Sequence, residues 1–304
     1  MSETHPSVSV IVPVYNGERT IGSCIRSLLE LDYPSSKLEI IIVDNNSKDG
    51  TARILREFPV VSMLEDLIQS SYAARNAGIG RAGGKVLAFT DSDCIVDKEW
   101  IAKAVDRMGD PRVGCVAGRI EGYSPSNYIE EYLIKTGCLT QGSTMFLPYA
   151  QTANAVYRRE VFDVIGRFEE HWKSGGDADL TWRMQLHSAY KFVQCDDALV
   201  YHVHRSTLKG FFRQRMTWGN GEVLMHKKYK GHLKTSKGDV AKEIMKDYKD
   251  LVRLVAKGLP SMAYRGLVSR GREPLDDRQL TMVAAVGRRL GRIRGSLQER
   301  EFYI

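Results

Sequence analysis

Val8-Ser9-Val10-Ile11-Val12-Pro13-Val14 and Leu38-Glu39-Ile40-Ile41-Ile42-Val43 are two apolar runs of strand length. The segment between them carries apolar residues at helical spacing, namely Ile21, Cys24, Ile25 and Leu28. A buried strand, an amphipathic helix and a second buried strand are typical of a βαβ unit, in which the two strands lie parallel. This stretch therefore predicts an α/β fold with a mostly parallel central sheet flanked by helices.

The same alternation continues beyond residue 50. Strands are predicted at residues 60–64, 85–90, 113–121 and 193–203. Helices are predicted around residues 72–76 and at 99–108, 157–165 and 177–186, with Gly166 closing the third. The periodicity of residues 124–149 is ambiguous.

The composition fits a folded protein without a spanning segment. The chain has 304 residues, of which 43% are hydrophobic, so it can bury a full core. No apolar run reaches about 18 residues, and the N-terminus lacks a signal-peptide pattern. We therefore expect a cytoplasmic protein. An odd number of isolated cysteines indicates reduced core thiols: Cys24, Cys94, Cys115, Cys138 and Cys195.

The charge is distributed unevenly along the chain. Residues 1–204 carry 21 Lys and Arg against 27 Asp and Glu, whereas residues 205–304 carry 23 against 10. We interpret residues 1–230 as a catalytic domain and residues 231–304 as a basic, amphipathic helical region. Its two apolar stripes are Leu251, Val255, Leu259 and Met262, and then Leu280, Val283, Val286, Leu290 and Ile293.

Pro260 is expected to kink or interrupt the first of these helices. The basic region either packs on the catalytic domain or lies on an anionic membrane surface as a peripheral attachment. Nucleic acid is not an expected partner, because no aromatic platform or recognition motif accompanies the basic residues.

Two acidic clusters can carry chemistry. Asp91-Ser92-Asp93 follows an apolar strand, where its carboxylates can hold Mg²⁺ or Mn²⁺, although such a run also suits a solvated turn. Gly175-Gly176-Asp177-Ala178-Asp179 begins a predicted helix, where Asp177 is either a functional carboxylate or an N-cap.

Four ordered motifs resemble the nucleotide-binding half of the family 2 glycosyltransferases, which have the GT-A fold: residues 8–16, 39–51, 74–78 and 89–93. Residues 154–159 and 177–180 resemble the acceptor half, so the resemblance runs from about residue 8 to 221. It implies an inverting, metal-dependent enzyme that uses a nucleotide-diphosphate sugar. The reaction would then be one in-line displacement without a covalent intermediate.

The resemblance assigns the nucleotide base to four residues. Tyr15 matches the residue that packs on the base, and Pro13 shapes that pocket. Asp44 and Asn45 match the base-recognition pair, although the family often has Asp in place of Asn45. UDP-sugars are favoured because the Asn45 amide oxygen can accept from the uracil imide, and GDP-sugars are possible because the amide can also donate.

The diphosphate and its metal are assigned to five residues. Arg75 matches a residue near the ribose or diphosphate. Asp91 matches the ribose and metal region, with Ser92 beside it in the donor site. Asp93 matches the principal ligand of Mn²⁺ or Mg²⁺, and His202 matches a third ligand.

On the acceptor side, Asp177 matches the catalytic base, and Gly176 stands where many members have Glu. Asp179 supports the helix start or the acceptor loop, and Asn154 lines the acceptor side. Gln214-Arg215-Met216-Thr217-Trp218 resembles the Gln-x-x-Arg-Trp motif of polymer-forming members, with Thr217 replacing the arginine. Since the chain lacks their transmembrane helices, single-sugar addition is predicted. Trp218 either stacks on an acceptor sugar or packs in the core.

The expected acceptor is a glycan or a lipid-linked saccharide, as in cell-envelope polysaccharide synthesis. Two alternatives differ in class. A nucleotidyltransferase would favour a Gly-rich or Lys-containing phosphate loop after the first strand, and Asn16-Gly17-Glu18-Arg19 is not one. A non-catalytic membrane-surface adaptor is disfavoured because Asp91, Asp93 and Asp177 are all present.

Overall fold

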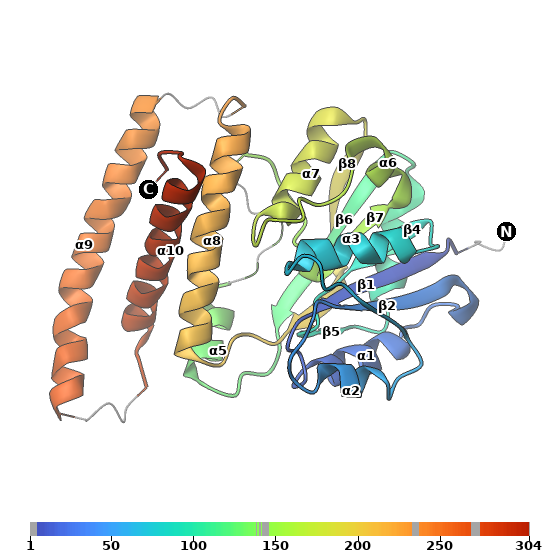
Figure 1. The fold of residues 1–304 in the computed structure, drawn as a ribbon, viewed down its shortest axis with the longest axis horizontal. Coiled ribbons are helices and arrows are strands. Elements are labelled where there is room, and N and C mark those ends of the chain that lie inside the picture. The colour runs from blue at the N-terminus through green and yellow to red at the C-terminus, as the bar shows by residue number, and fades with distance from the viewer. Residues whose placement is uncertain are drawn as a thin grey trace. The chain divides into compact units, whose positions relative to one another are not determined.

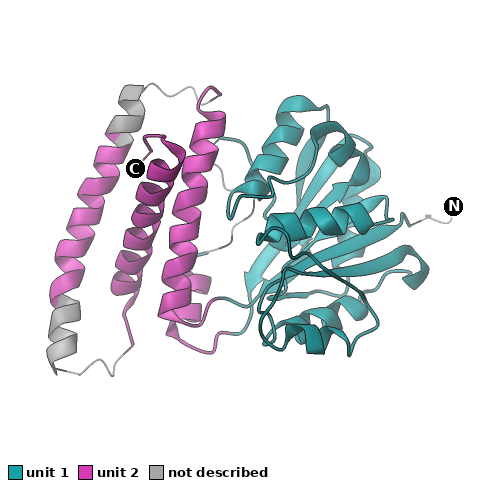
Figure 2. Ribbon diagram, viewed as in Figure 1, with its two compact units in different colours: residues 1–124, 137–204 teal, residues 125–136, 205–304 magenta. Residues whose placement is uncertain are grey.

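The computed structural model describes residues 5–137, 139, 141, 146–232, 237–268 and 274–303. Its contacts form two compact units, shown in Figure 2: residues 1–124 with 137–204, and residues 125–136 with 205–304. The predicted domain boundary at residue 230 stays a prediction. Cys138 and the side chain of Met262, both included in the sequence-based assignments, lie outside the described residues.

The first unit is built on an eight-stranded sheet with the order β3-β2-β1-β4-β7-β6-β8-β5 (Figure 1). The strands are β1 (Val8–Val14), β2 (Leu38–Asp44), β3 (Val61–Leu64), β4 (Val86–Phe89), β5 (Cys94–Val96), β6 (Val113–Gly122), β7 (Ala155–Arg158) and β8 (Lys191–His202). Strands β1 to β4 are mutually parallel where they pair, as is β6 with β8, whereas β7 and β5 pair antiparallel. The predicted α/β fold is confirmed.

Helices cover both faces of this sheet. They are α1 (Ile21–Leu29), α2 (Thr51–Leu55), α3 (Ser71–Arg81), α4 (Trp100–Asp106), α6 (Arg159–Ile165) and α7 (Gly176–His187), with short 3-10 turns η1 (Ser35–Lys37), η2 (Arg107–Gly109) and η3 (Thr152–Asn154). Side chains on successive positions of β1 enter opposite faces: Val10 and Val12 pack with α1, whereas Ile11 packs with Tyr72 of α3. All four apolar residues of the predicted α1 stripe are buried, which confirms that prediction.

The helix predicted over residues 157–165 begins only at Arg159. Tyr157 lies instead in β7, where it pairs with Leu87 of β4 and Cys115 of β6. The reason for the error is that an apolar run of three residues shows neither a helical nor a strand period. Gly166 does follow the helix, with a φ of 74° that favours glycine.

The second unit is helical, with α5 (Tyr128–Lys135), α8 (Leu208–Tyr229), α9 (Lys237–Val268) and α10 (Asp277–Glu299). Helices α8 and α10 approach closely through glycines on both. A Cβ atom on Gly291 would lie 2.0 Å from the Met216 carbonyl oxygen, and one on Gly219 would lie 2.0 Å from that of Arg288. Glu222 of α8 also forms ion pairs with Arg288 and Arg292 of α10. Arg288 and Arg292 belong to the basic region that the sequence suggested for a membrane surface, yet both stabilise the packing of α8 against α10.

The two predicted apolar stripes are only partly covered. Leu280 is buried, but Leu290 is 43% exposed. On α9, Leu251 is half-buried and Leu259 is 55% exposed. Of the two predicted effects of Pro260, interruption is wrong, because the helix continues through this residue, and the kink stays a prediction. Among the helices that the structure describes, none is both long and apolar enough to cross a membrane.

Candidate active site

The carboxyl ends of β1 and β2 bring the predicted base-binding residues to one edge of the sheet. Val14 pairs with Asp44, so Tyr15 and Asn45 follow two neighbouring strand ends. The Tyr15 side chain is 50% exposed and can present its ring to a flat ligand, whereas Pro13 is buried within β1. Asp44 is buried and accepts a hydrogen bond from the Ser47 backbone N–H at 3.0 Å.

The Asn45 side chain is already engaged in the fold. Its Nδ2 donates to the carbonyl oxygens of Glu65 at 2.8 Å and Ile68 at 2.9 Å. Its Oδ1 accepts from Gln69 Nε2 at 3.0 Å. Both amide hydrogens are therefore used inside the protein, and Asn45, which is 2% exposed, acts on a ligand through the 65–69 loop that it holds.

Arg75 of α3 contacts Asp91, one of the donor-side residues. Its guanidinium forms an ion pair with Asp91, which follows β4, and it lies over the Tyr72 ring at 5.5 Å from the centroid. The arginine is 3% exposed, whereas the Asp91 side chain keeps 30% of its surface accessible. Arg75 thus fixes a carboxylate that a ligand can still reach. Ser92 is half-buried in the turn between Asp91 and Asp93.

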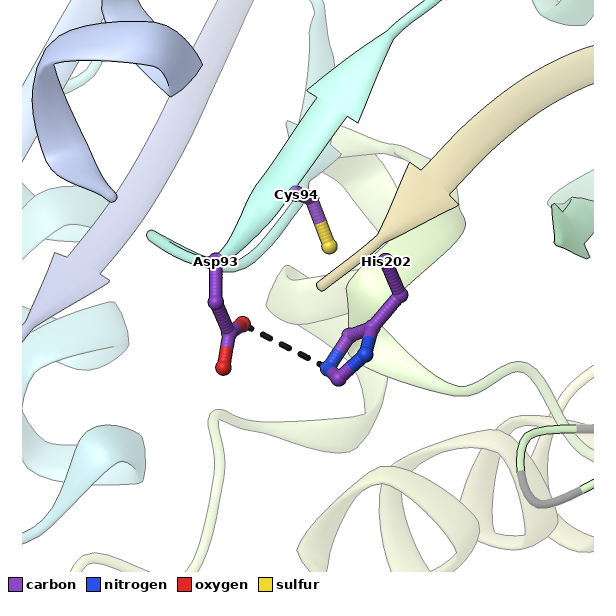
Figure 3. Close-up of side chains that lie close together, drawn as sticks. All are labelled: Asp93, Cys94 and His202. Atoms are coloured by element: carbon purple, nitrogen blue, oxygen red, sulfur yellow. Dashed lines mark ion pairs between the residues drawn. The ribbon is translucent and has the colours of Figure 1, made fainter. Parts of the chain in front are cut away.

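Asp93 and His202 are brought together by the antiparallel pairing of β5 with β8, in which Cys94 is the partner of His202. Asp93 Oδ1 lies 3.4 Å from His202 Nε2 (Figure 3). The ligand atoms of Asp93, Cys94 and His202 all lie within 4.8 Å of one another. His202 is buried, and its Nδ1 has no hydrogen-bond partner among the described residues.

The chemistry of these donors fits a hard or borderline divalent cation. Burial and the carboxylates of Asp91 and Asp93 raise the pKa of the Cys94 thiol well above its ordinary value. The cluster therefore offers a carboxylate oxygen and an imidazole nitrogen, a set that suits Mn²⁺ and, through oxygen, Mg²⁺.

Asp177 lies in the first turn of α7, and Gly175 precedes that helix with a φ of 85°. Asp177 Oδ1 accepts from the Ala178 backbone N–H at 3.0 Å and from the Tyr72 hydroxyl at 3.4 Å. Burial raises the pKa of the Asp177 carboxyl. A raised pKa strengthens a carboxylate as a proton acceptor, so this side chain has the properties of a general base.

Side chains of α3 and its N-cap also hold the segment that leads to Asp177. Asn76 donates to the Phe168 carbonyl oxygen and accepts from the Phe168 N–H. Ser70 donates to the Trp172 carbonyl oxygen at 2.7 Å. The Tyr72 ring stacks on Phe168, and its hydroxyl accepts from the Gly176 N–H at 3.0 Å. Sequence reasoning placed Tyr72 on a helix but missed this contact; the only available signal was its position one turn before Arg75.

The predicted acceptor-side residues are Asn154 and Asp179 of the first unit and Trp218 of the second. Asn154 is 0% exposed; it accepts from Trp100 Nε1 at 2.7 Å and donates to the carbonyl oxygens of Arg119 and Ala198. Its amide therefore links α4 to two strands in the core, and the expectation that Asn154 lines the acceptor side stays a prediction.

Asp179 is also fully buried, where it forms an ion pair with Arg183. Arg183 donates to the carbonyl oxygens of Ile165 and Arg167, so Asp179 anchors the loop before α7. Trp218 lies on α8 in the helical unit, with the Arg215 guanidinium 4.5 Å from its ring centroid.

Comparison with known proteins identifies similar chains. Residues 9–168 match the model of Glycosyl transferase family 2. The chain is 35% identical to the glycosyltransferase AglE of Haloferax volcanii over 233 residues, which are 73% of this chain and 75% of that protein.

Two solved structures share the fold. The mannosyltransferase PcManGT from Pyrobaculum calidifontis, in complex with GDP-Man and Mn²⁺, matches with a TM-score of 0.67 at 20% identity, over 98% of this chain and 89% of that one. The S. aureus TarS fragment 1–349, in complex with UDP-GlcNAc, matches with a TM-score of 0.55 at 18% identity, over 98% and 93%.

Proposed function

Because the chain belongs to glycosyl transferase family 2, it is an enzyme that transfers a sugar from a nucleotide sugar, and we propose that it does so by metal-dependent inversion. The observation that carries this proposal is the position of Asp177. Its carboxyl, with a raised pKa, is linked through Tyr72 and Arg75 to Asp91 on the donor side. A proton acceptor and a diphosphate-binding group are therefore held by the same part of the fold.

The acceptor hydroxyl attacks the anomeric carbon of the donor sugar while Asp177 takes the hydroxyl proton. The bond from the anomeric carbon to the diphosphate oxygen breaks, and its electron pair leaves with the nucleoside diphosphate. Asp93 and His202 would hold Mn²⁺ or Mg²⁺, which would supply positive charge to neutralise the leaving diphosphate. One displacement without a covalent intermediate inverts the anomeric configuration.

We assign the donor to nucleotide-diphosphate sugars, with UDP-sugars favoured and GDP-sugars second. Tyr15 offers an exposed ring for base stacking, and the buried Asn45 supports the base site by holding the 65–69 loop. Structural neighbours bind each kind of donor, namely GDP-Man and UDP-GlcNAc. The proposed acceptor is a glycan or lipid-linked saccharide in envelope polysaccharide synthesis, to which one sugar is added.

Donor hydrolysis in the absence of an acceptor tests this proposal. UDP- and GDP-sugars are incubated with the protein and Mn²⁺, and the anomeric configuration of the first sugar released is determined by NMR. An α-linked donor should release the β-anomer first. Initial release of the α-anomer would overturn inversion, and no hydrolysis of any donor above the rate of Asp177→Asn would count against the assignment of the site.

We further propose that α9 attaches the protein to an anionic membrane surface. Met245, Val252 and Leu259 recur every seven residues, so they share one helix face, and each is more than half exposed. Exposed basic side chains lie along the same helix: Lys242, Lys246, Lys249, Arg253 and Lys257. An apolar strip beside basic residues suits anionic headgroups, each basic residue contributing about 1 kcal/mol near such a surface.

Co-sedimentation with phosphatidylserine-containing and neutral vesicles tests the attachment. We expect binding to the anionic vesicles at low salt, loss at high salt, and loss in a Lys246→Glu/Lys249→Glu/Lys257→Glu variant. The matched control reverses three exposed basic residues of the first unit, Lys37, Arg56 and Lys98, and should still bind. Equal sedimentation with neutral vesicles would refute the proposal.

A further inference from the structure

Among the described residues, the Tyr72 hydroxyl is the side-chain group that donates a hydrogen bond to the Asp177 carboxylate. It accepts the Gly176 N–H at 3.0 Å and donates to Asp177 Oδ1 at 3.4 Å. The ring is 5% exposed, stacked on Phe168 on one side and covered by Arg75. The phenol therefore has little freedom to turn away from the carboxylate.

The two oxygens of Asp177 are not equivalent. Oδ1 accepts from the Ala178 N–H and from Tyr72, whereas no side chain of the described residues donates to Oδ2. A carboxylate held by one oxygen keeps the other available for a new proton. The 3.4 Å contact is long, as is common for catalytic hydrogen bonds before substrate binds.

We propose that Tyr72 is the positioning residue of the base: its hydroxyl holds Oδ1 of Asp177, so that Oδ2 is the oxygen that takes the acceptor's proton. This inference rests on the proposed role of Asp177 as base. Tyr72 itself transfers no proton, because burial keeps its phenol protonated by raising its pKa well above the ordinary value.

The glycine before the base is part of the same arrangement. A Cβ atom on Gly176 would lie 2.8 Å from Cε2 and Cζ of the Tyr72 ring, closer than real contacts allow. Any larger side chain at residue 176 would displace the phenol from Asp177. Gly176 and Tyr72 are therefore a matched pair, in which the absent side chain leaves room for the ring.

Other charged groups act on Asp177 from the elements around it. Arg75 on α3 favours the ionised Asp177 carboxylate, and Asp91 after β4 disfavours it. The charge of Asp177 in turn raises the pKa of the Tyr157 phenol on β7. Removing the Tyr72 hydroxyl leaves all three in place. The change in the Asp177 pKa then reports the lost hydrogen bond, and its direction is upward, because the bond stabilises the ionised form.

The test uses Tyr72→Phe and the donor that the hydrolysis screen selects, with Mn²⁺ present. We expect kcat at neutral pH to fall about tenfold, which is the effect of one hydrogen bond to a charged group. KM should stay within about threefold, and the acidic limb of the pH profile should move to higher pH. If Tyr72 only stabilised the fold, Tyr72→Phe would lower the thermal stability without moving the acidic limb of the pH profile.

Tyr33→Phe is the matched control, because it also removes a buried phenolic hydroxyl, which donates to the Pro6 carbonyl oxygen at 2.7 Å. Its pH profile should equal that of the wild type. If Tyr72→Phe fails to fold, Gly176→Ala is used instead. It displaces the phenol while the Tyr72 and Asp177 side chains are both retained, and it should move the acidic limb of the pH profile in the same direction.

A wild-type pH profile in the folded Tyr72 variant, or the same shift in Tyr33→Phe, would overturn the inference. Asp177→Asn separates this failure from that of the proposed function. If Asp177→Asn abolishes hydrolysis while the folded Tyr72 variant behaves as wild type, only the positioning role is wrong. If Asp177→Asn retains hydrolysis, the base assignment itself fails.

Discussion

Replacement of Asp177 by Asn should change activity and stability in opposite directions. The asparagine Oδ1 can keep the hydrogen bonds from Ala178 and Tyr72, so the local geometry is preserved. The oxygen that takes the proton becomes an amide group with no basicity. Loss of general-base catalysis costs about 10²–10⁴ in rate, roughly 3–5 kcal/mol in the activation barrier.

The stability change follows from the raised pKa of Asp177. Burial makes the folded protein bind a proton there more tightly than the unfolded chain does. Stability therefore falls as the pH rises from the unfolded pKa through the higher folded pKa, and at neutral pH the ionised carboxylate destabilises the fold. Asp177→Asn removes this cost, so the variant should unfold at a higher temperature than wild type at pH 7. Each 1 kcal/mol corresponds to roughly 2–4 °C in a domain of about 200 residues.

Thermal unfolding is measured from pH 7 down to pH 3, together with donor hydrolysis. The advantage of the variant should shrink as the pH falls and the wild-type carboxyl becomes protonated. Asp177→Ala serves as a control that also loses the hydrogen bonds of Oδ1 and should not be stabilised to the same extent. An Asp177→Asn variant less stable than wild type at neutral pH would refute the reasoning that burial raises this pKa.

Three further predictions concern the metal, the helical unit and the core. Asp93→Asn should weaken nucleoside diphosphate binding in calorimetry with Mn²⁺ but not with EDTA; equal affinity under Mn²⁺ would contradict the metal assignment. Gly291→Ala places a Cβ 2.0 Å from the Met216 carbonyl oxygen and should cost about 1–3 kcal/mol in denaturant unfolding, whereas an unchanged midpoint would mean that the helices can separate freely. Asn154→Ala removes the hydrogen bonds of Asn154 with Trp100 Nε1 and with two carbonyl groups, so it should destabilise the fold by about 3 kcal/mol or more. Nucleotide affinity should not change. A loss of affinity without loss of stability would show that Asn154 acts in the binding site.

The parts of the fold that sequence predicted well are those in which neighbouring residues determine the outcome. Strand β1 is recognisable as an apolar run and helix α1 by apolar residues at helical spacing. The carboxylates at the end of β2 and after β4 are placed by the strand ends. Strand β7 has four residues and depends on partners in β4 and β6, so no local pattern could distinguish it from the helix that follows.

The site contacts that sequence did not reveal have the same physical origin. Asn154 is a polar residue near the predicted acceptor motif, yet its burial is decided by Trp100 and two distant strands. The Tyr72 contact with Asp177 joins residues 105 positions apart in the chain. Residue type and spacing identify groups capable of chemistry, but which of them meet is determined by tertiary packing.

Helix α3 determines how precisely the base, Asp177, is spaced from Asp91 on the donor side. Tyr72, which meets the base, and Arg75, which meets Asp91, are separated by three residues, or about 4.5 Å of helical rise. A thermal displacement of α3 moves both contacts together, so errors in the two positions are correlated and largely cancel in the spacing between them. The tolerance of that spacing is therefore set by one turn of α3, whose backbone hydrogen bonds hold the two residues at a fixed rise.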